Sequence, residues 1–166
     1  VKEAALVASD SAAGQAFGGN ISVSGDVVVV TAIGDGHAGA NSGAAYVYRY
    51  DGAVWVEEQK LTASDASPGD YFGRAAAVSG DVITVGAHGS QVAGAVSGAT
   101  YVYRYNGAVW VGEQKLAASD ATSQDRFGNA VSVSGDTVVV GAHWNEEAGT
   151  RAGAAYVFTY DGMNWG

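Results

Sequence analysis

One unit of 55 residues occurs three times in this chain, at residues 1–55, 56–110 and 111–165, with no insertion or deletion between the copies. Twenty-three of the 55 positions hold the same residue in every copy. A fixed period of this length is typical of repeat architectures, in which one unit cannot bury its apolar surface without neighbours. The period therefore predicts one domain, residues 1–166, built from three like units.

Each copy contains the pattern of two consecutive β-hairpins. In the first copy, Phe17–Val23 and Val27–Val30 are rich in β-branched residues and flank a Ser-Gly-Asp turn. Ala44–Tyr50 alternates tyrosines with valine and arginine, and Asp51-Gly52 separates it from a fourth run over 55–62. We expect four antiparallel strands per unit, the second of them covered on both faces because it is apolar throughout.

These strands favour a β-propeller. Four-stranded antiparallel units that repeat with turn signals and without helical periodicity are typical of propeller blades. Parallel β-solenoids use coils of roughly 20–30 residues and do not place an Asn-Gly or Asp-Gly hairpin in every coil. We therefore predict an all-β fold with three four-stranded antiparallel blades in this chain.

Charge and composition exclude several classes of function. The net charge is −9, and the eight Lys and Arg residues form no cluster, so a nucleic-acid partner would find no basic patch. The longest apolar run, Val27–Ala32 with Thr31 inside it, is far shorter than the ~20 residues of a membrane helix, which argues against membrane insertion. The chain has no cysteine, so it has no disulfide, thiolate metal site or cysteine nucleophile.

A motif that is complete in the second copy has counterparts in the other two: Phe-Gly, a hydrophobic strand, Gly-Ala, and a small-residue loop that ends in Ser-Gly-Ala-x-Tyr-Val-Tyr. In the second copy its elements are Phe72-Gly73, Gly86-Ala87, Ser97-Gly98-Ala99 and Tyr101-Val102-Tyr103. The motif resembles the FG-GAP repeats of integrin α-subunit propellers and their bacterial relatives. The resemblance implies a propeller whose first strand lies nearest the axis, and recognition or adhesion in an extracellular or cell-envelope setting.

The chain departs from this family pattern in two ways. Ile33, His88 and His143 replace the proline of the family's Gly-Ala-Pro. Many relatives carry a calcium loop of the Asp-x-Asp-x-Asp-Gly kind between the Phe-Gly and Gly-Ala elements, where this chain has only Ser-Gly-Asp. One carboxylate cannot supply the six to eight oxygens that Ca²⁺ requires. The resemblance is therefore to a bacterial type that lacks the calcium loop, and we expect no metal and no cofactor.

The two ends of the chain fall inside a blade. Residues 1–9 match a fourth strand, whereas the third copy stops at Trp165, before its own fourth strand. Propellers have about 4–8 blades, so three blades do not close a ring. We expect a homodimer of six blades, in which residues 1–9 of each chain complete the last blade of the other. A ring of three chains and excision from a longer propeller are the alternatives.

The least similar segment lies between the second and third strands, at 34–43, 89–98 and 144–153. On a propeller this loop shares one face with the connection from the fourth strand to the next blade, and binding residues collect on such loops. Trp144 is the one tryptophan outside the repeated position, equally suited to contact a ligand or a neighbouring blade. The candidate ligand-binding residues are Asp35, His37, Asn41, Tyr71, His88, Gln91, Arg126, His143, Trp144, Asn145, Glu146, Glu147 and Arg151.

Residues that recur in every copy are interpreted as structural. The repeated tryptophans and tyrosines are expected to pack between blades. The repeated aspartates are expected to cap turns by accepting main-chain N–H bonds; they are Asp10, Asp65 and Asp120, and Asp26, Asp81 and Asp136. The other structural positions are Phe17, Gly18, Phe72, Gly73, Phe127, Gly128, Trp55, Trp110 and Trp165.

Together these patterns predict a non-enzymatic, self-assembling propeller module that binds a protein or a glycan through its loop face. Its expected partners are a second copy of itself and an extracellular protein or glycan. The alternative is a purely structural repeat fragment, natural or designed by consensus, whose only activity is ring assembly. No Ser-His-Asp or paired-carboxylate signature favours a hydrolase, so no catalytic residue is assigned.

Overall fold

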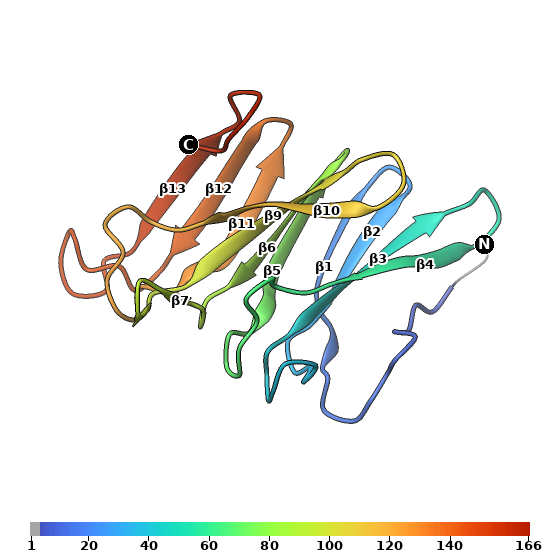
Figure 1. Ribbon diagram of the computed structural model, residues 1–166, viewed down its shortest axis with the longest axis horizontal. Helices are drawn as coiled ribbons and strands as arrows, with labels where there is room; N and C mark the ends of the chain where they lie inside the picture. The colour runs from blue at the N-terminus through green and yellow to red at the C-terminus, as the bar shows by residue number, and fades with distance from the viewer. Residues whose placement is uncertain (1–3) are drawn as a thin grey trace.

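The computed structural model describes residues 4–166, and every regular element in them is a β-strand (Figure 1). The first sheet contains β1 (Phe17–Ser24), β2 (Val27–Ala32), β3 (Ala44–Tyr50) and β4 (Trp55–Leu61). The second contains β5 (Phe72–Ser79), β6 (Val82–Ala87), β9 (Ala99–Tyr105) and β10 (Trp110–Leu116). The third contains β11 (Phe127–Ser134), β12 (Thr137–Ala142) and β13 (Ala154–Thr159).

Each sheet is an antiparallel meander whose neighbours follow one another along the chain, as the sequence predicts for propeller blades. The expectation of four strands per unit was wrong for the second copy, which has two further short strands. The loop 89–98 contains a short ladder between β7 (Gln91–Val92) and β8 (Ala95–Val96). Ala93 and Gly94 form its turn with φ values of 50° and 86°, a left-handed conformation that glycine adopts readily.

The described part of the predicted strand at residues 1–9, residues 4–9, forms no strand within this chain. Residues 1–3 lie outside the described part, and residues 4–9 have no strand partner. The carbonyl of Val7 instead accepts a hydrogen bond from the Tyr48 hydroxyl at 2.8 Å. The segment thus lies against the first blade, in the place that the β4–β5 connection takes against the second, where Thr62 accepts from Tyr103. In residues 4–166 no helix is long and apolar enough to cross a membrane.

Adjacent blades are joined at their first strands. Asn20, Ser22 and Ser24 of β1 accept hydrogen bonds from the main-chain amides of Ala76, Val78 and Gly80, at 2.9, 3.1 and 3.1 Å. Ser79 of β5 accepts from the amide of Gly135 in the same way, at 3.2 Å. These side chains therefore satisfy N–H groups on the free edge of the next blade's first strand.

Two of the three repeated tryptophans, Trp110 and Trp165, also join neighbouring blades. The indole N–H of Trp110 donates to Glu58 at 3.0 Å, and that of Trp165 donates to Glu113 at 2.8 Å. The side chain of Gln59 donates to the carbonyl of Trp110 and accepts from its amide, each at 2.8 Å. The fourth strands β4 and β10 thus each form hydrogen bonds with the tryptophan of the following copy.

The last blade has an open face where a following blade would stack. Side chains at two matched positions show it. Val29 and Thr84 are 0% exposed, but Val139 is 36% exposed; Val47 and Val102 are 0% and 1% exposed, but Val157 is 63% exposed. The prediction that every second strand is covered on both faces is therefore wrong for β12, because no fourth blade lies beside it.

The first blade has the opposite open face. Ile21 and Val23 of β1 are 70% and 66% exposed, whereas Ala76 and Val78, at the matched positions of β5, are each 7% exposed. Ile21 and Val23 form one side of an apolar recess with Phe17 and Val28. The two apolar faces belong to the first and third sheets. These two sheets lie at opposite ends of the stack (Figure 1).

Candidate functional site

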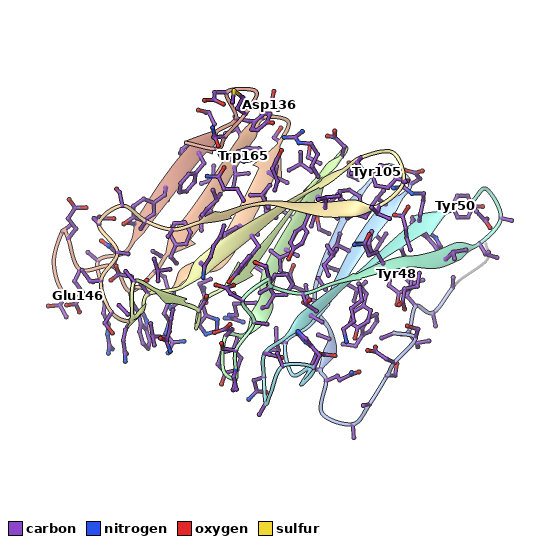
Figure 2. All side chains as sticks on the ribbon, in the orientation of Figure 1. Tyr48, Tyr50, Tyr105, Asp136, Glu146 and Trp165 are labelled. Carbon is purple, nitrogen blue, oxygen red and sulfur yellow. The ribbon has the colours of Figure 1, made fainter. Side chains whose placement is uncertain are left out.

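All the loops predicted to form one face lie along one edge of the molecule. In Figure 1 the β2–β3, β6–β9 and β12–β13 connections lie at the lower edge, with the β4–β5 and β10–β11 connections beside them. Figure 2 shows Glu146 at this edge and Asp136 and Trp165 at the opposite one. We call the lower edge the loop face.

A recess of about 420 Å³ opens on this face where three blades meet. The starts of β5 and β11 contribute Tyr71, Arg74, Arg126 and Asn129, and the ends of β2, β6 and β12 contribute Ile33, His88, His143 and Trp144. Tyr71 and Arg126 precede their Phe-Gly elements with φ values of 54° and 59°. Ala16 has the same conformation, at 55°, so this geometry belongs to the blade design rather than to the recess.

The recess is lined by stacked aromatic and cationic groups. The rings of Tyr71 and His88 stack with centroids 5.1 Å apart. The guanidinium of Arg126 lies 4.1 Å from the centre of the Trp144 ring, and that of Arg151 lies 4.6 Å from it. The ring centroid of His143 lies 5.4 Å from that of the same indole. Trp144, which could contact either a ligand or a blade, thus holds two arginines at the loop face.

The positive charge of the recess is not neutralised inside the protein. Elsewhere in residues 4–166, carboxylates pair with Arg49, Lys60, Arg104 and Lys115. Arg74, Arg126 and Arg151 form no ion pair with any described carboxylate; Arg74 donates to the side-chain oxygen of Asn129 at 3.0 Å. The unpaired arginines of an acidic chain are therefore concentrated here.

Both histidines of the recess are held neutral. Burial, together with the charges of Arg126, Arg74 and His143, lowers the pKa of His88 to about 4. Burial and the same two arginines lower the pKa of His143. Two atoms here also lack partners: Nδ1 of His88 and Nε of Arg126 are enclosed but bond to no described residue. The recess is a site of unrelieved positive potential.

Asp35 is not part of the recess, because it is buried in the first blade. Its carboxylate accepts from the Lys60 ammonium at 2.8 Å, from Gln15 at 3.0 Å and from the Tyr46 hydroxyl at 3.2 Å. His37 donates its amide and lies with Nδ1 2.8 Å from the same group. Burial acts to raise the pKa of Asp35, but bonds from Lys60 and His37 outweigh it and hold the pKa at about 2.

Asn145 takes the same place in the third blade and is also buried. Its amide nitrogen lies 3.2 Å from the Tyr156 hydroxyl, and its oxygen accepts from the amide of Glu147 at 3.1 Å. Asp35 and Asn145 therefore organise their loops and do not face solvent. The remaining candidates outside the recess are exposed on separate parts of the loop face; they are Asn41, Gln91, Glu146 and Glu147.

The repeated aspartates accept different donors from those predicted. Asp10, Asp65 and Asp120 accept from the hydroxyls of Tyr46, Tyr101 and Tyr156, at 2.7, 2.6 and 2.8 Å. Asp26 and Asp81 pair with Arg49 and Arg104, at 3.4 and 3.7 Å. The main-chain capping role belongs instead to Asp51, Asn106 and Asp161, which accept from amides two and three residues ahead.

Three residues of the recess, Ile33, Arg74 and Asn129, were not among the candidate binding residues. Arg74 and Asn129 lie on first strands, at a position where the first copy has Gly19. The variation at this position, in the middle of a conserved motif, is the signal that could have indicated them. Within residues 4–166 no three His, Asp or Glu side chains are grouped so as to hold a metal ion.

The fold and this loop face define a protein of propeller-blade repeats. The model of the FG-GAP repeat family matches residues 1–48, 55–103 and 110–158, so the chain belongs to the FG-GAP repeat family. No curated protein matches the chain.

Proposed function

We propose that this chain is a non-enzymatic propeller module that assembles with a second copy into a closed ring of six blades and binds a protein or glycan ligand through its loop face. FG-GAP repeats suggest a binding or adhesion module of the propeller type. An extracellular or cell-envelope setting goes with that role.

The observation that carries the assembly is the match between the two open faces. Val139 and Val157 lie at positions that the next blade covers in the first two blades, and Ile21 and Val23 lie at positions that the preceding blade covers in the second. The face of the third blade is thus shaped for a first blade. Contact between the third blade of one chain and the first blade of another, made twice, is a head-to-tail arrangement that closes.

The glycines at these faces support the same contact. A Cβ on Gly43 or Gly98 would overlap the main chain of the next blade, at Phe72 or Phe127. Gly153, at the matched position, has no such neighbour in this chain. We infer that the absent side chain at Gly153 leaves room for the main chain of a first blade at Phe17.

The mass of the chain in solution tests the proposal. Light scattering across a dilution series is expected to give twice the chain mass of 16.7 kDa. A mass of three chains would indicate a ring larger than the proposed six-blade ring. A single-chain mass at high micromolar concentration would overturn the assembly and leave the open faces to be covered by something other than a second copy.

A further inference from the structure

We propose that the recess between Tyr71, His88, Arg126 and Trp144 binds an acidic saccharide, a sugar ring that carries a carboxylate or a sulfate group. The inference names a ligand class for the proposed binding function. All the residues that line the recess belong to one chain, so the site does not depend on ring closure.

The charge of the ligand follows from the unpaired arginines. The side chain of Arg126 donates no hydrogen bond to any residue of 4–166, and the same holds for Arg151. A guanidinium offers five donors in a planar fork that matches carboxylate and sulfate oxygens. An anion placed among Arg74, Arg126 and His88 would receive donors that the protein leaves free and would relieve the mutual repulsion of these groups.

The aromatic side chains that line the recess indicate that the ligand contains a sugar ring. Tyr71 and His88, stacked on each other, line the recess from the second blade, and Trp144, with Arg126 4.1 Å from its ring centre, lines it from the third. Apolar faces of sugar rings pack on such aromatic groups, while their hydroxyls bond to polar groups such as the Asn129 amide. The volume of about 420 Å³ lies within the range of roughly 300–1,000 Å³ for small-molecule sites.

An acidic peptide fits the recess less well. A peptide lying across the loop face would meet the exposed carboxylates of Glu146 and Glu147, which follow Trp144 in the same loop. A chain of net charge −9 also repels an extended polyanion. A single charged ring avoids both effects because it enters the recess and presents one anionic group to it.

Titration with matched sugars tests the proposal on the whole chain. The probes are glucuronic acid and glucose 6-sulfate, with glucose as the uncharged match and inorganic sulfate as the anion without a ring. The readout is the indole N–H resonance of Trp144, assigned from its loss in Trp144→Phe. We expect saturable shifts with both acidic sugars and none with glucose, and at least about tenfold weaker binding of sulfate, a difference of ~1.4 kcal/mol.

Charge variants then locate the site. Arg126→Gln and Arg74→Gln are each expected to weaken glucuronic acid binding at least about tenfold. Arg49→Gln removes the same charge at the opposite edge, beside Asp26 and Glu58, and is expected to leave binding unchanged. Because Arg74 is exposed on β5, its variant keeps the test valid if Arg126→Gln does not fold.

The pH dependence of binding gives a second readout. The groups that face His88 are the Tyr71 ring, Arg74, Arg126 and His143, and none of them is anionic at neutral pH. A bound anion raises the pKa of His88 from about 4, so glucuronic acid is expected to bind more tightly as the pH falls through the raised pKa. His88→Gln should remove most of that increase.

Four results would overturn the proposal: equal binding of glucose, equal binding of inorganic sulfate, tighter binding of a glutamate tripeptide, or unchanged affinity in Arg126→Gln and Arg74→Gln. Each can be obtained whether the chain is a monomer or a ring. Failure of the saccharide site is therefore distinguishable from failure of the proposed assembly.

Discussion

Gly98 lies directly against the main chain of Phe127, across the boundary between the second and third blades. The two residues form an isolated parallel bridge, and the amide of Phe127 donates to the carbonyl of Ser97 at 2.9 Å. Gly98 has a φ of 91°, and an added Cβ would overlap the carbonyl and amide of Phe127. One atom of side chain at this position would hold two blades apart.

We expect Gly98→Ala to be far more destabilising than Gly153→Ala. Both positions have positive φ, 91° and 78°, so each substitution carries a conformational cost of about 1–2 kcal/mol. Within a single chain only the alanine at 98 also meets a neighbouring blade, so the comparison is made at concentrations where the chain is a monomer; in the proposed ring the alanine at 153 would meet Phe17 of the second copy. Urea denaturation of the two variants should show the difference in the free energy of unfolding. Equal losses would mean that the contact at Gly98 contributes little.

The two open faces can be tested with a pair of variants, each of which carries one altered face and one intact face. Ile21→Asp and Val157→Asp each place a carboxylate on one face, so each variant alone is expected to sediment as a monomer. A mixture should regain a two-chain species, because the intact face of each variant matches the intact face of the other. An interface between two identical faces would instead be disrupted by only one of the two substitutions, and the other variant would remain a dimer. Val111→Asp is the control, since Val111 is 46% exposed on the outer strand β10.

One substitution near the N-terminus, at Ala5, is expected to strengthen the proposed association of two chains. Lys60 and Lys115 bond to the aspartates of their blades at 2.6 and 2.7 Å, but the first copy has Ala5 at the matched position. If this strand completes the third blade of a second copy, Ala5→Lys brings an ammonium to Asp120 and tightens association severalfold, since exposed pairs contribute about 0.2–1 kcal/mol. Ala5→Gln is the neutral control in analytical ultracentrifugation. An unchanged dimer constant would place the strand elsewhere.

Acid should weaken the first blade through Asp35. Its pKa is about 2 in the folded chain, below the ordinary value of 3.8, so its contribution to stability is present above pH 4 and is lost as the pH falls toward 2. The shift corresponds to about 2 kcal/mol. Asp35→Asn should lower the free energy of unfolding by a similar amount at pH 7 and flatten its decline in acid. The matched control is Asp26→Asn, which changes a carboxylate that is 58% exposed.

The strands could be predicted from the sequence because their signals are local. Alternation of tyrosine and valine in 44–50, and the Asp-Gly or Asn-Gly turns that follow, lie within one hairpin of each other. The tyrosine hydroxyl partners could not be predicted in this way. Asp10 lies 36 residues from Tyr46, and Lys60 lies 50 residues from Asp10, so their meeting depends on how one blade's connection packs on the next.

The loop face was predictable, but its recess was predictable only in part. Tyr71, His88, Arg126, His143 and Trp144 were candidates because they flank variable loops, and the structure brings these five together. Asp35 and Asn145 shared that signal yet are buried. Variation alone cannot separate a residue that faces solvent from one whose partner changed with it: Gln15 accompanies Asp35, and Asp125 accompanies Asn145.

The side chains of Asn20, Ser22 and Ser24 have a consequence for how such proteins lengthen. An unpaired strand edge normally invites another strand, the first step of fibril growth. Here the neighbouring blade's side chains occupy those amides, so the axis-side edge accepts no further strand. At this edge the array therefore lengthens by whole 55-residue units, each of which offers side-chain acceptors to the next blade and receives those of the preceding blade. No single unit specifies the blade number, which must be set by the angle at which the blades meet.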